Sequence, residues 1–297
     1  MTNKYSLGWI PDYPDFRDYT EETEEVKEIL KPSGLLFGAA GKKQQKAKPL
    51  PASVDLRQWC SLVEDQGRLG SCTAHAGVGI IEYYERKSFG RHIDASRLFL
   101  YKVTRNLMKM RGDTGAYLRS TIGAMVLFGV PPEEYWPYTD NPQDFDKEPP
   151  AFCYSFAQNY KTIKYYRHDP PSAAPEVILN RIKTYLAAGH PPMFGFTVYS
   201  SIEQASDSGQ IPFPSQRERI EGGHAVTAAG YDDRLKIRNR FGRDETIGAL
   251  LIRNSWGKDW GEDGYGWLPY EYVLRGLAED FWSVLKKDWI DTGQFRI

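Results

Sequence analysis

The number of cysteines is the first chemical feature of this sequence. The chain has three, Cys60, Cys72 and Cys153, so at least one thiol lacks an intrachain partner. Cys72 stands in QGRLGSCTA, where a glycine-containing loop leads into a helical pattern. A helix N-terminus and a nearby imidazolium both favour thiolate, and together they lower a cysteine pKa from about 8.5 to roughly 3.5–4. Cys72 is therefore the candidate nucleophile. Cys60 and Cys153 are expected to be reduced and buried, with a bridge between them left open.

Two later segments supply groups that could activate this thiol. GGHAVTAAGY, residues 222–231, places His224 at the start of a strand-like run, and LIRNSWGKDWGEDGYGW, residues 251–267, places Asn254 beside aromatic residues. An imidazole can take the thiol proton as a general base, and an amide can orient that imidazole. The other histidines show no partner pattern and are expected to be structural: His75, His92, His168 and His190.

The order of Gln66, Cys72, His224 and Asn254 resembles the papain-like cysteine peptidase family. LPASVDLR at 50–57 is similar to the family's mature N-terminus, and EEYWPY at 133–138 to its tyrosine-proline-tyrosine segment. The opening GWIPDYPDFRDY is similar to the bacterial members. The resemblance implies a peptidase that cleaves proteins or peptides through an acyl-enzyme on Cys72.

The resemblance also implies a role for each residue of the constellation. Cys72 would attack, and His224 would take its proton and later protonate the leaving amine. Asn254 would orient the imidazole, while the Gln66 amide and the Cys72 N–H would form the oxyanion hole. Trp256 would shield the His–Asn hydrogen bond from water.

A substrate cleft is implied in the same way. Gly115 and Ala116 would offer backbone to an extended substrate, and Glu279 would lie at the floor of the S2 pocket, where a carboxylate could pair with Arg or Lys at P2. The full set of implied substrate-binding residues is Gly70, Gly115, Ala116, Tyr117, Leu118, Phe196, Ala225, Trp256 and Glu279.

The chain departs from the family pattern in two places. Thr73 follows the nucleophile where the family usually has tryptophan, and Leu69 and Asp113 stand where it usually has a disulfide. Both half-cystines are missing together, which fits a reducing compartment. Two other functions remain open, a catalytically silent binding protein of the same fold and a cysteine-dependent acyltransferase. The complete set of four residues favours proteolysis over both.

Periodicity indicates the elements that must position these residues. Helical patterns cover 20–30, 72–87, 116–129 and 174–188, whereas 193–199, 224–231, 248–256 and 265–270 are short, β-rich and punctuated by glycine. Helices come first and strands afterwards, so the sequence predicts an α+β fold with a helical lobe, mainly 66–185, and a β-barrel-like lobe, mainly 190–285. The catalytic cleft is expected between them.

Residues 1–49 are expected to form a separate segment ahead of a catalytic domain at 50–297. Prolines and aromatics in 5–19 favour an extended strip, and the polar, lysine-rich stretch 38–51 is typical of a linker. The segment is too short for the family's helical prodomain. Two placements remain open. The strip could lie across the cleft and limit access, or it could pack on the back of the domain.

Composition excludes several classes of protein. The chain has 297 residues with a formal charge of −1, so it lacks the basic footprint of a nucleic-acid binder. It shows no apolar run long enough to span a membrane, no zinc-type spacing and no secretory signal. We expect a monomeric enzyme without metal or cofactor. Localisation is left open between the cytoplasm and export by a non-classical route.

Overall fold

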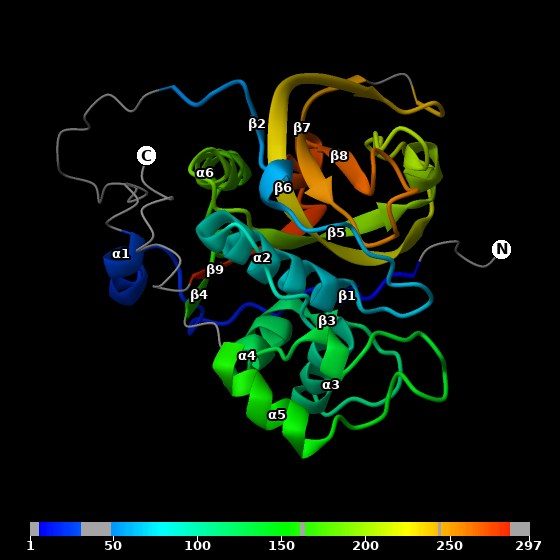
Figure 1. Cartoon of the computed structure of the whole chain (residues 1–297). Helices are drawn as coiled ribbons and strands as arrows, with labels where there is room; N and C mark the ends of the chain where they lie inside the picture. Colours follow the sequence, from blue (N-terminus) through cyan, green and yellow to red (C-terminus); the bar gives the residue numbers. More distant parts are fainter. Residues whose placement is uncertain (1–5, 31–48, 161–163, 243–244, 286–297) are drawn as a thin grey trace.

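A computed structural model describes residues 6–30, 49–160, 164–242 and 245–285. Helices gather in one half of the molecule and an antiparallel sheet in the other (Figure 1). The α+β class predicted from the sequence is confirmed. Among the described residues, no helix has the length and apolar character needed to cross a membrane.

The central helix of the molecule is α2 (Cys72–Phe89), which carries the candidate nucleophile at its first residue. Nearly every side chain of α2 is buried, because the helix packs on α3 and α4 on one side and on the sheet on the other. It ends at Gly90, whose φ of 73° is the left-handed conformation that glycine adopts without strain. The helical half is completed by α4 (Leu118–Phe128) and α5 (Ala151–Ala157).

Helix α3 (Arg97–Leu107) is an element that the apolar pattern did not reveal. Its basic residues are buried rather than exposed, which disguises the helix as a polar stretch. Arg97 pairs with the buried Glu82, and Lys102 and Arg105 share Asp146. Burial of charge is tolerated where each cation finds a carboxylate.

The sheet has seven strands, and along its main path they run in the order β4, β9, β5, β6, β7 and β8. Their bounds are β4 Lys164–Arg167, β5 Met193–Tyr199, β6 Ile220–Arg238, β7 Glu245–Arg253, β8 Tyr265–Pro269 and β9 Ala278–Leu285, with β2 (Ser53–Asp55) paired to β6. The pairing of β5 with β6 sets Phe196 opposite His224, and that of β5 with β9 sets Gly195 opposite Glu279.

Two helices cover the sheet half. Helix α6 (Pro175–Ala187) begins with a proline in its first turn and packs on β6 and on α7 (Tyr270–Leu274). The helix predicted at 174–188 is therefore present, but it packs on the sheet and α7 and not on α3, α4 or α5. Single turns of 3₁₀ helix occur at Arg57–Trp59, Glu133–Tyr135 and Gln158–Tyr160, and a longer one at Ser200–Ala205.

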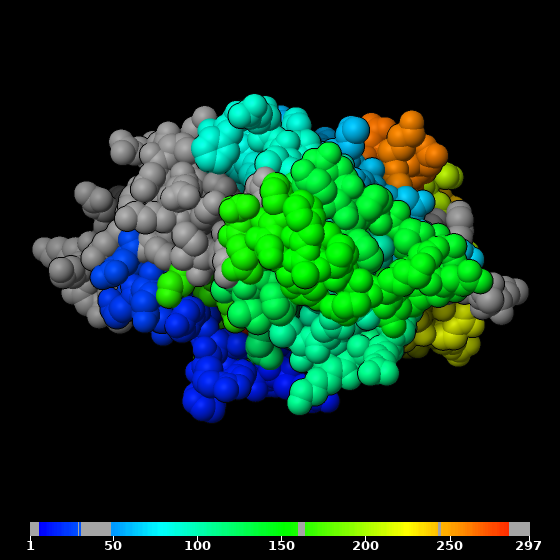
Figure 2. All heavy atoms as spheres, turned by 60° about the horizontal axis from the view of Figure 1, so that its bottom comes forward, coloured from blue at the N-terminus to red at the C-terminus, as the bar shows by residue number. Residues whose placement is uncertain are grey.

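The N-terminal part of the chain crosses from one half to the other. β1 (Trp9–Ile10) pairs in parallel with β3 (Ala116–Tyr117), which directly precedes α4. Helix α1 (Glu24–Leu30) follows and buries Val26 and Leu30 against a cluster of Tyr166, Tyr185 and Ala188. Figure 2 shows the N-terminal part of the chain in blue on the surface, beside the green part that belongs to the helical half. The predicted linker at 38–51 lies, as far as residue 48, outside the described residues.

Candidate active site

Cys72 lies at the N-terminus of α2, and a hydrogen-bond chain holds the loop before it. The Tyr138 hydroxyl donates to the carbonyl of Gln66 at 2.8 Å and lies 2.7 Å from the hydroxyl of Ser71, the residue directly before the helix. Because the Tyr138 proton is used on Gln66, the Ser71 hydroxyl donates to Tyr138. The Cys72 side chain is fully buried, and its Sγ accepts the backbone N–H of Ala225 at 3.4 Å.

The residue before Ala225 is His224. The hydrogen bond from Ala225 to Cys72 therefore places the thiol next to the part of β6 that carries the imidazole. His224 Nε2 lies 2.7 Å from Oδ1 of Asn254, which also accepts the N–H of Ser255 at 2.8 Å. An amide oxygen only accepts, so the proton of a neutral His224 is on Nε2. Nδ1 is then the basic nitrogen, and it has no hydrogen-bond partner within the described part of the chain.

Trp256 covers the His224–Asn254 pair. Its ring stacks on the imidazole with centroids 4.4 Å apart and planes 24° apart. Water is thereby kept from one face of the hydrogen bond, which strengthens it. This is the position that the resemblance assigns to Trp256.

Gln66 is tied to the same constellation through a residue that sequence reasoning did not single out. The hydroxyl of Ser255 donates to Oε1 of Gln66 at 2.6 Å, which turns the Gln66 NH₂ group outward. Nε2 donates to the carbonyls of Leu69 at 2.7 Å and of Ser6 at 3.1 Å. Gln66, Cys72, His224 and Asn254 are therefore brought together at one place between the two halves.

Burial keeps the reacting pair neutral in this structure. It raises the pKa of the Cys72 thiol to about 11, against the opposing effect of hydrogen bonds from the Ala225 and Gly8 N–H groups. Burial also lowers the pKa of His224 to about 4, against the opposing hydrogen bond to Asn254. The pair is therefore thiol and imidazole at neutral pH, not the thiolate and imidazolium of a reactive nucleophile.

The cover over the site is the N-terminal segment. Gly8 donates its N–H to the Gly223 carbonyl at 3.0 Å, and its own carbonyl accepts the N–H of Ala116 at 2.8 Å. The approach is so close that a Cβ on Gly8 would lie 1.9 Å from the carbonyl oxygen of Gly70, and one on Gly115 would lie 2.3 Å from the Gly8 oxygen. Thus Gly70, Gly115 and Ala116, implied to hold substrate backbone, contact residues 7–10.

The other residues implied to line the substrate pocket lie near the N-terminal segment or on the strand beneath it. Tyr117 faces Tyr13, with ring centroids 6.3 Å apart, and Leu118 is buried at the start of α4. Phe196 is buried and meets His224 edge-on at 5.8 Å. Strand alternation therefore leaves Gly195, on the opposite face of β5, toward the segment.

The carboxylate that reaches the segment is that of Asp280, not of Glu279. Glu279 is exposed, whereas Asp280 is fully buried and accepts the indole N–H of Trp9 at 3.1 Å. Gly195 pairs with Glu279, and the register of β5 with β9 shifts between Met193 and Gly195, so this part of β9 does not follow regular strand alternation. Asp280 also has a φ of 59°, a left-handed backbone that the sequence pattern does not reveal.

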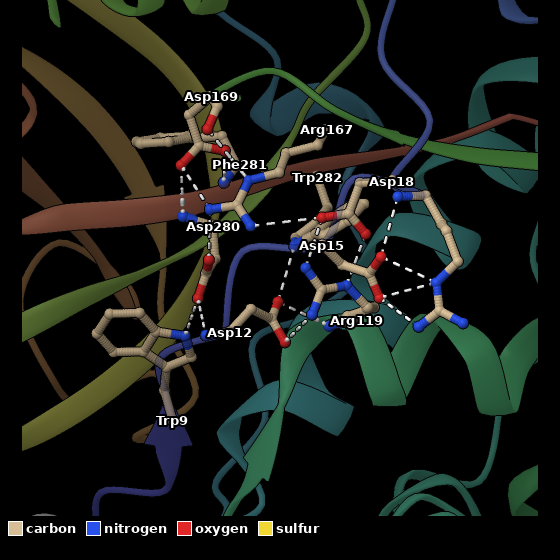
Figure 3. A network of polar contacts seen from close by, with 11 residues as sticks. Trp9, Asp12, Asp15, Asp18, Arg119, Arg167, Asp169, Asp280, Phe281 and Trp282 are labelled. Carbon is tan, nitrogen blue, oxygen red and sulfur yellow. Dashed lines mark hydrogen bonds and ion pairs between the residues drawn. The ribbon is translucent and has the colours of Figure 1, made fainter. Parts of the chain in front are cut away.

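Asp280 belongs to a buried ionic network that fastens the segment (Figure 3). The backbone N–H of Asp12 donates to Asp280 at 2.8 Å, and the Trp282 indole donates to the Asp12 carboxylate at 3.1 Å. Arg119 donates its backbone N–H to Asp12 at 3.1 Å and its side-chain Nε to Asp18 at 2.7 Å. The segment is thus bound by charge on one side of the site and by backbone pairing over the nucleophile.

The cysteine pattern of the structure agrees with a reduced protein. All three cysteines are free, so no bridge joins Cys60 to Cys153. At the family's usual disulfide position, the Asp113 carboxylate accepts the N–H of Gly70 at 2.9 Å and the hydroxyl of Tyr101 at 2.5 Å. Hydrogen bonds therefore connect the two loops that the disulfide would join.

Three possible metal-ligand atoms come together at Glu82, His92 and Asp94. The Glu82 carboxylate is already used, because it accepts from Ser61 at 2.5 Å and from Arg97 at 3.1 Å. A guanidinium next to a candidate ligand opposes a cation, so the group acts as an ion-pair network of α2 and α3.

Comparison with known proteins gives this geometry a family. The model of the papain family cysteine protease matches residues 50–279. The chain belongs to the papain family of cysteine proteases. A peptidase C1-like protein of Acanthamoeba polyphaga mimivirus is 34% identical over 250 residues, which cover 80% of this chain and 76% of the viral one. A cathepsin B-like protein of Giardia intestinalis is 30% identical over 231 residues, 74% of this chain and 69% of that protein.

Among solved structures, this papain-family chain is similar to xylellain, a cysteine protease from Xylella fastidiosa. The two share 35% identity with a TM-score of 0.72, over 95% of this chain and 96% of xylellain. Procathepsin L 3 from the midgut of Tenebrio molitor has the same fold at 21% identity, with a TM-score of 0.60 over 88% of this chain and 79% of that one. The papain-like fold and the cysteine peptidase activity expected from the sequence are confirmed.

Proposed function

We propose that Cys72 and His224 hydrolyse peptide bonds, with Asn254 and Gln66 in supporting roles. The hydrogen bond from His224 Nε2 to Asn254 carries this assignment, because it leaves Nδ1 as the basic nitrogen, on the residue next to Ala225, whose N–H donates to Cys72 Sγ. Nδ1 takes the thiol proton while Sγ bonds to the substrate carbonyl carbon. The resulting oxyanion accepts hydrogen bonds from Gln66 Nε2 and the Cys72 N–H.

The same groups then complete acylation and hydrolyse the acyl-enzyme. The imidazolium gives its proton to the amine as the C–N bond breaks, which leaves an acyl-enzyme on Cys72. His224 then removes a proton from water, whose oxygen attacks the thioester. The C–S bond breaks, a carboxylic acid leaves and the thiol is restored.

We further propose that residues 6–12 are a built-in inhibitor of this site. The Ser6 carbonyl takes the Gln66 donor, and the Gly8 N–H, which donates to the Gly223 carbonyl, lies close to the sulfur where a substrate would present a carbonyl carbon. The segment therefore blocks the nucleophile without offering it a bond to attack. Substrates are proteins or peptides. That the enzyme acts as a monomer without a nucleic-acid partner stays a prediction.

A thiol-directed epoxide tests the assignment. The full chain and its Gly8→Ala variant are incubated with the epoxide, and the modified peptide is mapped. We expect slow modification of Cys72 in the wild type and faster modification in the variant, together with hydrolysis of a fluorogenic peptide. Labelling confined to Cys60 or Cys153, or labelling of Cys72 without any hydrolysis, would support a silent binding protein instead. Transfer of the acyl group to an added amine in preference to water would support the acyltransferase.

A further inference from the structure

The side chain of Trp9 fills a pocket between β5 and β6. A Cβ on Gly195 would lie 1.9 Å from indole Cε2, and a Cβ on Gly223 would lie 2.7 Å from Cε3. Gly195 pairs with Ala225, two residues after Gly223, so both glycines lie on one face of the sheet. The space for the ring exists because neither position carries a side chain. Gly195, Gly223 and Asp280 are called the indole pocket below.

The polar end of the indole pocket is rigid and is built from the catalytic domain alone. Asp280 Oδ2 accepts the indole N–H at 3.1 Å, and Oδ1 accepts from Arg167 at 2.8 Å. Arg167 is fixed in turn by Asp169, whose carboxylate also accepts the N–H groups of Asp280 and Phe281 (Figure 3). The carboxylate therefore keeps its orientation when the segment leaves.

The indole pocket lies where the family resemblance implies the S2 pocket, with Asp280 in place of Glu279 as its carboxylate. Gly8 lies over Cys72, and Trp9 is the next residue, so the pocket accepts the side chain adjacent to the residue at the sulfur. Ala116, which pairs with Trp9, offers backbone at the same level.

We infer that the indole pocket is a specificity site for tryptophan, in which Asp280 recognises the indole N–H of the substrate as it does that of Trp9. The inference rests on the proposed function of Cys72. Within this structure Oδ2 of Asp280 also accepts the N–H of Asp12, which departs with the segment. Once the segment has left, the indole N–H of a substrate can donate to Oδ2 of Asp280. Phenylalanine or leucine would fill the space but leave a buried carboxylate oxygen without a partner, which is a strong basis for discrimination.

A basic side chain meets a different environment. Arg167 already lies 2.8 Å from Asp280 and 3.0 Å from Asp169, so the carboxylate at the pocket floor has its cation. A second guanidinium or ammonium would face Arg167 directly. The indole N–H is a donor without that charge, which is why the pocket favours tryptophan over arginine.

The test uses the full chain and peptides of the form X-Gly-aminocoumarin, with X as Trp, Phe, Leu or Arg. The leaving group is constant, so only the side chain next to the reacting residue varies. The ratio of kcat/KM between two peptides cancels the fraction of enzyme blocked by its segment, since that fraction is common to both. We expect Trp to exceed Phe by about tenfold or more.

Two variants locate the cause. Asp280→Asn should reduce the Trp-to-Phe ratio to nearly one, and Gly195→Ala should lower kcat/KM for Trp relative to Leu because the methyl group occupies the ring's space. Gly123→Ala is the matched control, since a Cβ there meets no atom within 4 Å. Its ratios should equal those of the wild type. A Trp-to-Phe ratio of one in the wild type, or a preference for Arg, would overturn the inference.

The outcome also separates this inference from the proposed function. Hydrolysis of all four peptides with equal kcat/KM rejects the indole pocket as a specificity site and leaves Cys72 as nucleophile. Hydrolysis of none, by either the wild type or Gly8→Ala, with no epoxide on Cys72, rejects the proposed function and the subsite together. If Asp280→Asn does not fold, the Gly195→Ala ratio decides alone.

Discussion

The Nε2 atom of Gln66 donates a hydrogen bond to the carbonyl oxygen of Ser6 at 3.1 Å. The donor expected to stabilise a substrate oxyanion is thus used by a residue sixty positions earlier in the same chain. The Trp256 indole points to the same carbonyl at 3.4 Å. The N-terminal segment therefore contacts the groups proposed to do the chemistry, as well as the residues around them.

The closest backbone approach in the cleft gives the first prediction. In Gly8→Ala the new Cβ would lie 1.9 Å from the Gly70 oxygen, so the segment must move away from the nucleophile. We expect epoxide labelling of Cys72 and peptide hydrolysis to rise about tenfold or more, since overpacking typically costs about 1–3 kcal/mol. Gly123→Ala should leave both rates unchanged. Equal rates for Gly8→Ala and the wild type would show that the segment does not limit access.

The oxyanion donor gives the second prediction, measured in the Gly8→Ala background so that loss of the Ser6 contact does not intervene. Adding Gln66→Ala should lower kcat by about 10²–10³, because that donor acts mainly on the charge of the transition state. The matched control is Gln216→Ala, an exposed glutamine far along the chain. Cys72→Ala should abolish turnover. If Gln66→Ala changed only KM, the amide would be a binding group and not an oxyanion donor.

The third prediction concerns pH and rests on Asp12. Burial, then repulsion from Asp280, raises the pKa of Asp12 in the docked segment to about 7, against attraction by Arg119. The groups that face or adjoin it are Asp280 and Trp282 of β9, Arg119 of α4, Asp18 of the segment and Arg167 of β4.

The sign follows from linkage. The docked form holds a proton that the free segment gives up near the ordinary value of 3.8, so docking is strongest below that pH and weakens as pH rises to about 7. The labelling rate of the wild type, divided by that of Asp12→Asn at the same pH, should rise over this range by at most about tenfold per unit and then level off. The division cancels the titration of Cys72 itself. A ratio that falls with pH would contradict the prediction.

The fourth prediction concerns the loops that lack the family's disulfide. Asp113→Ala removes the acceptor of the Gly70 N–H and the Tyr101 hydroxyl. Loss of a partner for such donors typically costs about 1–3 kcal/mol, which is a fall in Tm of about 2–10 °C for a domain of this size. Asp207→Ala, an exposed carboxylate, is the control. An unchanged Tm would mean that water replaces the carboxylate at no cost.

The candidate site was largely predictable from the sequence, because its four residues sit in short motifs whose order is informative. Ser255 and Tyr138 were within those motifs, but their roles depend on hydrogen bonds across the cleft. Asp280 could not be found in this way. Its left-handed backbone and burial follow from Arg167 and Asp169, which lie more than a hundred positions earlier.

The fold was predictable where apolar periodicity was undisturbed, as in α2, α6 and strands β5 to β8, whereas β4 and β9 lie outside the strands predicted from the sequence. Helix α3 was missed because Arg97, Lys102 and Arg105 stand on buried positions, and only their distant carboxylate partners make that possible. The extended character of residues 5–19 followed from prolines and aromatics. The place of residues 6–12 over Cys72 depends on glycines at 70, 115, 195 and 223. Their lack of side chains makes room for the segment, and only the structure shows that they lie around it.

Helix α1 has a consequence for the inhibition that is proposed for residues 6–12. Val26 and Leu30 remain packed on Tyr166 and Tyr185, and Glu21 remains bonded to Tyr185, whether or not residues 6–12 leave the cleft. Residues 6–12 are then tethered to the domain by about ten residues, which gives them an effective concentration at the cleft in the millimolar range. Dilution cannot relieve such inhibition, and closing is a first-order event. A substrate therefore competes for the cleft with a segment of the same chain, whose local concentration does not fall when the protein is diluted.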